Sequence, residues 1–245
     1  MSINKQKVET EVTGSAKTPG QSIGTLGEKS LHAGLKDWYR QPNDSLEKMV
    51  DGFFIDIVRG NLLIEIQTTN FFSIKNKLRT LIEKHPVRLV YPISKEKWIV
   101  RVAADGITQI GRRKSPKKGD IFNLFEEMVS IPGLIKYPNF SMEVLLIREE
   151  EIRCDDGLGS WRRKGWSIVD RRLIELVEKY VFKKPADFSA LIPEKLSNPF
   201  TTNELAQVIN QPRWLAQKMA YCLRNMDTIT IHGKKGNSIL YSFLK

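Results

Sequence analysis

The sequence predicts an α/β fold in which helices cover both faces of a sheet. Short apolar, β-branched segments alternate with segments in which apolar residues recur at helical spacing. The predicted strands are apolar on both faces, which is typical of buried strands in α/β sheets. The chain has 245 residues, 41% of them hydrophobic, so it can bury one large core or two smaller ones.

The N-terminal region predicts a tail followed by a helix. Residues 1–24 are rich in Lys, Thr, Ser, Gly and Gln, so we expect a disordered tail. Thr25 and Glu28 have the spacing of a capping box, which predicts a helix over residues 26–40. Three apolar residues follow at helical spacing: Leu31, Leu35 and Trp38.

The next elements are a hairpin, a helix and further strands. FFIDIV at 53–58 and LLIEIQT at 62–68 flank Gly60 and Asn61, which are typical of a two-residue hairpin turn. A helix is predicted over residues 70–84 by its apolar stripe. The remaining elements of this region are strands at 87–93, 98–103 and 142–148, a basic loop at 111–119 and a short helix at 120–130.

The C-terminal region predicts a second, smaller domain. CDDGLGS at 154–160 is a predicted linker, and residues 168–182 are predicted to form an amphipathic helix. Residues 201–245 predict two short helices, at 202–210 and 212–226, and then a hairpin around GKKGN. This order is typical of a winged-helix domain whose first helix is 168–182.

Two carboxylates lie inside the apolar hairpin, Asp56 and Glu65. If residues 60–61 form the turn, Arg59 pairs with Leu62, and counting outward places Asp56 opposite Glu65. Burying two unpaired carboxylates side by side is unfavourable. The pair therefore predicts a divalent cation, Mg²⁺ or Mn²⁺, held by hard oxygen ligands. The alternative is an ion pair of either carboxylate with a nearby cation: Lys75, Lys77 or Arg101.

The helix–strand–strand–helix–strand order, with Asp on one strand and Glu-x-Gln on the next, resembles the PD-(D/E)XK nuclease superfamily over roughly residues 25–105. The resemblance implies a restriction-endonuclease-like core over residues 25–155: helix–strand–strand–strand–helix–strand, with a mixed sheet flanked by helices. A linker and helix at 156–200 and the winged helix at 201–245 would follow. The implied activity is Mg²⁺-dependent hydrolysis of phosphodiester bonds in DNA.

The resemblance also implies roles for single residues. Asp56 and Glu65 would bind the metal with the carbonyl oxygen of Ile66, and Glu28 would be the acid of the first helix. Asp51 is the alternative first acid, although strand alternation points it to the opposite face from Asp56.

Gln67 occupies the position of the family's usual lysine, and it lies on the same strand face as Glu65. Glutamine carries no charge. A lysine of the following helix, Lys75 or Lys77, is therefore a candidate for the missing cation. The alternative is a catalytically inactive nuclease fold that binds DNA or acts as a regulator.

The net charge of +11 predicts a polyanionic partner, nucleic acid before an anionic membrane. The predicted phosphate-binding residues of the basic loop are Arg112, Arg113, Lys114, Lys117 and Lys118. Those of the winged helix are Arg213, Gln217, Lys218 and Arg224 on its second helix and Lys234 and Lys235 in the wing. A solvated loop and a protein-binding winged helix are the alternatives.

Cys154 and Cys222 are far apart and form no CxxC motif, so a reducing cytoplasm is the simplest location. No signal peptide and no membrane-spanning run is predicted. A homodimer is a further expectation, because many nucleases of this superfamily dimerise. His32 lies one turn beyond Glu28, and a structural role or assistance at the site are both open for it.

Overall fold

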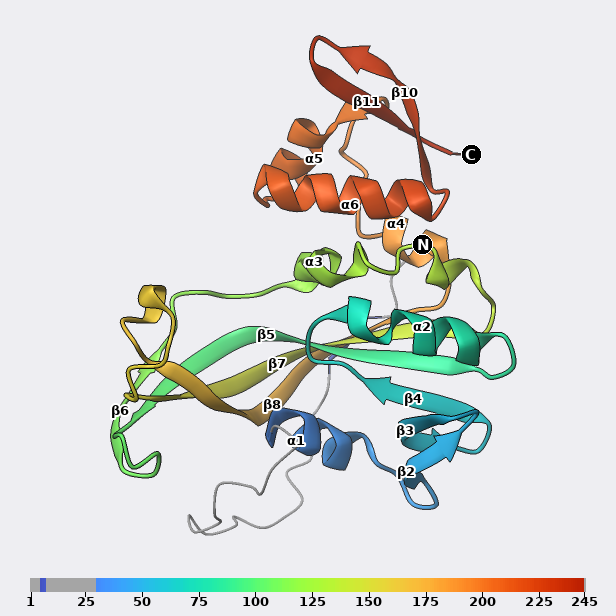
Figure 1. Ribbon diagram of the computed structural model, residues 1–245. Coiled ribbons are helices and arrows are strands. Elements are labelled where there is room, and N and C mark those ends of the chain that lie inside the picture. The colour runs from blue at the N-terminus through green and yellow to red at the C-terminus, as the bar shows by residue number, and fades with distance from the viewer. Residues whose placement is uncertain (1–4, 8–29, 245) are drawn as a thin grey trace.

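The computed structural model describes residues 5–7 and 30–244 (Figure 1). Its main element is an eight-stranded mixed sheet with the strand order β1-β8-β7-β5-β4-β3-β2, in which β6 pairs with β5 at the side. A three-stranded sheet, β10-β11-β9, lies in the C-terminal part. The predicted mixed α/β fold with a large sheet flanked by helices is confirmed at this level.

The first half of the core follows a simple order. Its elements are α1 (Ser30–Tyr39), β2 (Ser45–Val50), β3 (Phe53–Arg59), β4 (Leu62–Ile66), α2 (Phe71–Ile82) and β5 (Val87–Val102). β2, β3 and β4 are antiparallel neighbours, and β4 runs parallel to β5. The predicted hairpin and both predicted helices are confirmed within a few residues. The sequence does not predict strand β2, because β2 is a mostly exposed edge strand without an apolar pattern.

The sheet extends beyond the predicted strands into an arm, which we define as residues 95–115 and 148–175. β5 is one strand where two were predicted, because β7 (Phe140–Cys154) pairs with it along its whole length. Part of the predicted basic loop is a strand, β6 (Gln109–Lys114), which pairs with β5. Long-range pairing therefore orders polar segments that look like loops in isolation.

The predicted helix over residues 168–182 is wrong, since the segment forms strand β8 (Ser167–Phe182). Its apolar residues fit both periods. Tyr180 and Phe182 alternate toward the face covered by α2 and α3, whereas Leu176, beyond a bulge in the ladder with β7, faces α1. β8 pairs with β7 from Phe182 to Ser167, and this ladder outweighs the local helical preference.

Short helices lie between the later strands of the sheet and before the C-terminal part. They are the 3₁₀ turn η1 (Ile121–Leu124), α3 (Phe125–Met128), the 3₁₀ turns η2 (Leu134–Lys136) and η3 (Trp161–Arg163), and α4 (Pro185–Ser189). The predicted helix at 120–130 is thus a 3₁₀ turn followed by one α-helical turn.

The C-terminal elements match the predicted order. They are β9 (Phe200–Thr201), α5 (Thr202–Val208), α6 (Arg213–Asn225), β10 (Ile229–Lys235) and β11 (Ser238–Phe243). The capping box at the start of α5 is present, with Thr201 N donating to Glu204 Oε2 at 2.6 Å.

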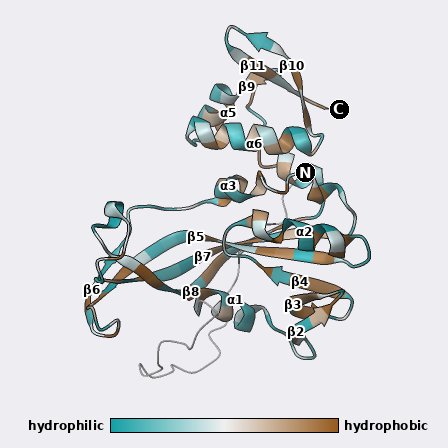
Figure 2. Cartoon of the chain, viewed as in Figure 1, coloured by the Kyte–Doolittle hydropathy of each residue, from teal (hydrophilic) through white to brown (hydrophobic). Residues whose placement is uncertain are grey.

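Two apolar layers hold the sheet. α1 packs with Ile57, Ile64 and Ile66 on one face. On the other face α2, α3 and the C-terminal helices share one continuous buried cluster, in which Phe125 of α3 joins Leu215 of α6. Figure 2 shows these apolar segments along the central strands and the packed sides of the helices. The C-terminal part is therefore fused to the core through α3 and α6.

Part of the predicted tail is ordered, because β1 (Lys5–Lys7) pairs antiparallel with β8. The rest of that tail, Thr25 and Glu28 lie outside the described residues. Cys154 and Cys222 are free and buried. Within the described ranges, the helices are too short or too polar to cross a membrane.

Candidate active site

The candidate site lies where β3 and β4 separate. Their pairing runs from Arg59–Leu62 to Ile57–Ile64, which is the predicted register. At the next position the carboxylate of Asp56 replaces the backbone ladder, and its Oδ2 accepts from the Ile66 amide at 2.8 Å. The strands diverge here, and the side chain of Asp56 fills the gap.

Glu65 is buried, with 8% of its surface exposed. Its Oε1 accepts from Lys77 Nζ at 2.5 Å, and the same ammonium donates to the carbonyl oxygen of Phe54 at 2.6 Å. Its Oε2 is shielded from solvent and has no hydrogen-bond partner among the described residues. A buried carboxylate oxygen without a partner is unfavourable unless a bound ion or water compensates it.

Burial and the nearby negative charge of Asp56 raise the pKa of Glu65 above its usual value. The two carboxylates are thus close enough to repel each other, as the hairpin register predicted.

The pKa of Asp56 is shifted the other way. Burial acts to raise it, but hydrogen bonds from His32 and the Ile66 amide, with the positive charges of His32 and Lys77, outweigh burial and lower the pKa. His32 Nε2 lies 3.2 Å from Asp56 Oδ2. The environment therefore moves the pKa values of Asp56 and Glu65 in opposite directions, a separation that is common in active sites.

His32 reaches Asp56 because α1 is fixed to the sheet. Ser30 at its start donates through N and Oγ to the carboxylate of Asp170 on β8, at 3.2 Å and 2.7 Å. The apolar side of α1, with Leu31 and Leu35 fully buried, faces the sheet. His32 follows Leu31 and so lies at the margin of this packed face.

Gln67 does not extend toward the carboxylates. Its Nε2 donates to the carbonyl oxygens of Thr69 and Asn70 in the loop after β4. The cation that does reach Glu65 comes from α2, and it is Lys77. Lys75 lines a different hollow with Arg79 and Tyr137, because residues two apart on a helix point in different directions.

The alternative first acid, Asp51, lies in the turn between β2 and β3. Its Oδ2 is 3.1 Å from His85 Nε2 and 3.7 Å from Lys84 Nζ. Asp56 is therefore the Asp that lies beside Glu65.

The oxygen donors at the site are few. Within residues 5–7 and 30–244, no three His, Cys, Asp or Glu side chains are grouped as metal ligands. The described donors for a metal are the carboxylates of Asp56 and Glu65 and the main-chain carbonyl of Ile66, with Glu28 outside the described residues. The unpartnered Oε2 of Glu65 fits a hard cation.

The predicted basic loop is split in two by the fold. Arg112 and Lys114 lie over the ring of Trp98, at 5.2 and 5.1 Å, and pair with Glu150 and Glu96. The other predicted cations of this segment are exposed: Arg113, Lys117 and Lys118.

The predicted residues of α6 are also divided. Lys218 faces α3, where its Nζ donates to the carbonyl oxygen of Glu126 at 3.3 Å, so it does not lie on the outer face of the helix. Arg213, Gln217 and Arg224 are exposed, as is Lys234 in the hairpin. The hairpin's Lys235 pairs with Glu204 at 3.3 Å.

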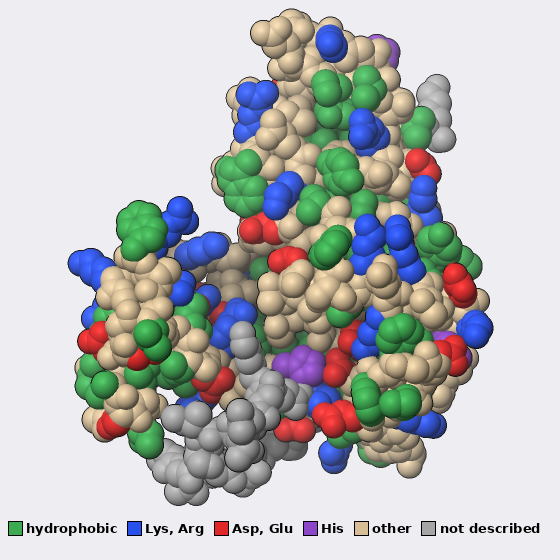
Figure 3. Space-filling view, viewed as in Figure 1, with side chains coloured by type: hydrophobic (Ala, Val, Ile, Leu, Met, Phe, Trp, Pro, Cys, Tyr) green, Lys and Arg blue, Asp and Glu red, His purple; other side chains and the backbone are tan. Residues whose placement is uncertain are grey.

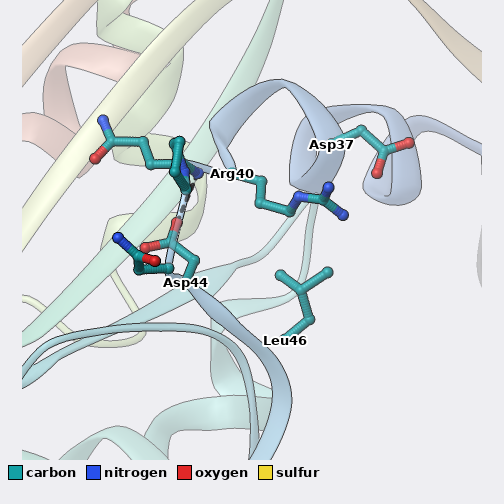
Figure 4. Close-up of a pocket in the computed structure, with 7 residues that line it drawn as sticks. Asp37, Arg40, Asp44 and Leu46 are labelled. Atoms are coloured by element: carbon teal, nitrogen blue, oxygen red, sulfur yellow. Dashed lines mark hydrogen bonds between the residues drawn. The ribbon is translucent and has the colours of Figure 1, made fainter.

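A hollow of ≈ 500 Å³ lies at the end of α1, away from these residues (Figure 4). Asp37, Arg40, Asp44 and Leu46 surround it. Asp44 accepts from Arg59 Nη2 and from the amide of Gln41, both at 2.8 Å, so its carboxylate closes the turn after α1. This hollow contains none of the predicted site residues.

The chain belongs to the family described as "Domain of unknown function (DUF8091)", which matches residues 29–183. A protein of Treponema pallidum (strain Nichols), described as "Uncharacterized protein", is 30% identical over 221 residues, 90% of this chain and 87% of the relative. No solved structure matches the chain. The family match contains α1, the hairpin and the whole arm, so the site lies within the shared domain.

Proposed function

We propose that the protein is a metal-dependent nuclease of the PD-(D/E)XK type, which hydrolyses phosphodiester bonds in DNA. The observation that carries the proposal is the buried, unpartnered Oε2 of Glu65 beside the ionised carboxylate of Asp56. A site that concentrates negative charge and leaves one oxygen unsatisfied favours a bound Mg²⁺ or Mn²⁺.

The order of elements supports this proposal. α1, β2, β3, β4, α2 and β5 follow the helix–strand–strand–strand–helix–strand order that the resemblance implies. The two acids lie on β3 and β4, the central strands of that order, and β4 is parallel to β5. The restriction-endonuclease-like core is part of the proposal.

Asp56, Glu65 and the Ile66 carbonyl would hold the metal, and Glu28 remains the predicted fourth ligand. When bound, the metal supplies activation of the attacking water and neutralises charge that develops on the phosphate. His32 is a positioning residue, because its hydrogen bond holds Asp56 in the orientation in which Oδ2 also receives the Ile66 amide.

In this proposal Lys77 supplies the positive charge of the family's usual lysine, because Gln67 at that position carries no charge. Its ammonium reaches the site from α2 and is already within bonding distance of Glu65. We assign to Lys77 the orientation of the attacking water and stabilisation of the phosphate charge.

The C-terminal elements form the DNA-docking part of the proposal. The helix pair α5 and α6 with the hairpin of β10 and β11 has the order of a winged helix, although residues 168–182 do not supply its first helix. The exposed polar residues available for contact are Arg213, Gln217, Arg224 and Lys234. Salt-dependent binding of duplex DNA, weakened by Arg213→Ala with Lys234→Ala, is the expected result.

Cleavage assays test the nuclease directly. Plasmid, single-stranded and branched DNA are incubated with Mg²⁺ or Mn²⁺ and either the wild type or Glu65→Gln, which preserves shape and removes the charge. We expect cleavage by the wild type and a loss of about 1,000-fold in the variant. Equal cleavage by both proteins would show that the site is misassigned.

A second candidate function is a catalytically inactive, DNA-binding nuclease fold. It is favoured by one observation: Lys77 already neutralises Glu65, and the amide of Gln67 is bonded to the loop. Calorimetry with Mn²⁺ separates the two functions. The nuclease should bind Mn²⁺, and Asp56→Asn should abolish this binding. The inactive fold should show no Mn²⁺ binding that depends on Asp56. The cytoplasmic location and the homodimer remain predictions, and sedimentation of the full chain tests the latter.

A further inference from the structure

A hollow of ≈ 330 Å³ adjoins the candidate site. It begins at Thr68 and Thr69, directly after the β4 segment that carries Glu65, and its floor is formed by residues 91–94 of β5. Figure 3 shows this face hollowed between the arm and the rest of the molecule, with Lys and Arg side chains on the arm side and Asp and Glu side chains opposite. A DNA strand that extends from the proposed metal site along Thr68 and Thr69 would enter this hollow.

The arm provides a basic wall. Its residues come from three strands and the loop after β6: Lys97, Arg153, Arg171 and Lys117. Two almost fully buried carboxylates hold three of these cations in place, Glu149 with 0% and Glu151 with 4% of the surface exposed.

The ion pairs behind this wall are short. Lys97 Nζ lies 3.2 Å from Glu149 and 2.7 Å from Glu151. Arg171 pairs with Glu149 at 2.7 Å and Arg153 with Glu151 at 2.6 Å. Three cations against two carboxylates leave positive charge in excess. Because the side chains are already ordered, an anion that binds to them loses little affinity to side-chain entropy.

Two cations of the wall have donors without an acceptor. The Nε of Arg171 is buried behind the wall and has no hydrogen-bond acceptor among the described residues. Lys117 is exposed and forms no ion pair with a described residue.

The opposite wall is acidic and amide-bearing. Glu127 is already used, because it accepts from the Phe71 amide at 3.1 Å and so caps α2. Asn123 Nδ2 donates to Glu126 Oε1 at 2.7 Å, and Oε2 of Glu126 forms no hydrogen bond with another described residue. Glu126 is therefore the acceptor that this wall presents to a ligand.

We infer that this hollow binds one unpaired nucleotide of the DNA strand, with its phosphate against the basic wall and the amino-bearing edge of its base toward Glu126. The inference rests on the proposed nuclease function, because it takes the strand to be the substrate. A ligand with an anionic end and a hydrogen-bond-donating end matches two walls of opposite charge. The base must be unpaired, since a base in a duplex has its pairing edge occupied.

Binding assays with matched variants test this subsite. The probe is a fluorescein-labelled single-stranded oligonucleotide of mixed sequence, measured by anisotropy in Ca²⁺ over a range of salt concentrations. Lys117→Ala removes a cation of the hollow, and Lys195→Ala removes an exposed lysine that does not line the hollow. We expect Lys117→Ala to weaken binding about fivefold and lower the salt slope by about 0.7, and Lys195→Ala to change affinity less than twofold.

A second pair of variants avoids damage to the fold. Arg171→Lys keeps the charge that pairs with Glu149 and removes the planar guanidinium group that lines the hollow, and Arg172→Lys is the control on the next residue of β8. We expect a loss of about fivefold for the first and none for the second. Glu126→Gln should weaken an oligo(dC) strand more than an abasic strand of equal length, because only the former offers a base amino group.

Three results would overturn the subsite: equal affinities for Lys117→Ala and Lys195→Ala, no effect of Arg171→Lys, or an equal loss of oligo(dC) and abasic-strand binding in Glu126→Gln. Failure of the nuclease proposal is recognised separately. In that case, the single-stranded probe binds as expected while the wild type with Mn²⁺ cuts no DNA. If the wild type cuts and the hollow variants bind normally, the subsite alone is wrong.

Discussion

The candidate site and the arm both bury pairs of carboxylates, and they neutralise them differently. In the arm, Glu149 and Glu151 are held by three cations at 2.6–3.2 Å. At the site, Asp56 and Glu65 share Lys77 and a histidine, and Glu65 keeps an oxygen without a partner. Glu149 Oε2 also lacks a hydrogen bond to a described residue, but it lies 2.7 Å from Arg171 Nη2, and three cations outnumber the two carboxylates of the arm. The second region has fewer cations than its buried acids need, and it is the region to which our proposal assigns a metal ion.

The largest expected effect tests the cation deficit at the site. Asp56→Asn should lower metal-dependent cleavage about 1,000-fold, because it removes a ligand charge while it keeps the hydrogen bonding capacity of the side chain. Asp51→Asn, in the turn between β2 and β3, is the matched control and should cleave like the wild type. The measurement is the single-turnover rate on plasmid DNA. Equal losses in the two variants would remove the distinction between these acids.

The next effect tests whether the arm carboxylates are structural. Glu149→Gln should destabilise the fold by about 3 kcal/mol, because it leaves two cations around a neutral group in a buried position. Glu65→Gln should change stability by less than about 1 kcal/mol, because the amide oxygen still accepts from Lys77 and the cost of burying a charge disappears. Urea unfolding at neutral pH measures both. The comparison fails if Glu65→Gln is the more destabilising change.

The third effect tests the cation of the candidate site, Lys77, instead of its carboxylates. Lys77→Met should slow cleavage about 100-fold, because no other described cation reaches Glu65. Lys75→Met, two residues earlier on the same helix, should slow cleavage less than twofold. A larger effect of Lys75→Met on cleavage would mean that the helix presents its other face to the substrate.

The smallest effect concerns pH. The raised pKa of Glu65 means that protons compete with a metal above the ordinary Glu range. Mn²⁺ affinity should therefore rise about tenfold per pH unit up to the pKa of Glu65 and then level off. Calorimetry at several pH values measures this, and Glu65→Gln should abolish the slope. A wild-type affinity that is constant between about pH 4.5 and 7 would contradict the prediction.

The free energy of unfolding should depend on pH in two opposite ways, because the pKa values of Asp56 and Glu65 are shifted in opposite directions. The lowered pKa of Asp56 stabilises the fold at neutral pH, and this contribution is lost as the pH falls through its folded pKa. The raised pKa of Glu65 acts in the opposite sense. Its contribution is present below the ordinary pKa of Glu and is lost as the pH rises through the folded value.

The sequence predicted the parts of the site that local rules determine. Gly60 and Asn61 set the hairpin turn, and the turn in turn set the register of Asp56 and Glu65. The choice between Lys75 and Lys77 depends on how α2 is rotated against the sheet, which no short pattern contains. The hydrogen bond of His32 likewise depends on Asp170, which is far away in the sequence.

The arm could not be predicted in the same way. β8 carries apolar residues that fit a helix, and only its pairing with β7 decides the matter. Lys97, Arg153 and Arg171 lie on three different strands, so their approach to Glu149 and Glu151 follows from the sheet order alone. A useful signal exists in hindsight: Glu149 and Glu151 lie two residues apart on β7, so strand alternation places both on one face of the sheet.

The shared packing of α3 and α6 has a mechanical consequence. Because Phe125 and Leu215 belong to one cluster, the C-terminal helices cannot swing without opening the main core. The distance between the C-terminal hairpin and the candidate site should therefore be constant, and the protein should unfold in a single thermal transition. A DNA strand bound at the tip of this hairpin would then reach Asp56 and Glu65 at a fixed distance from the point where it is bound. If the proposed nuclease activity is correct, the cleavage products should have a narrow distribution of lengths.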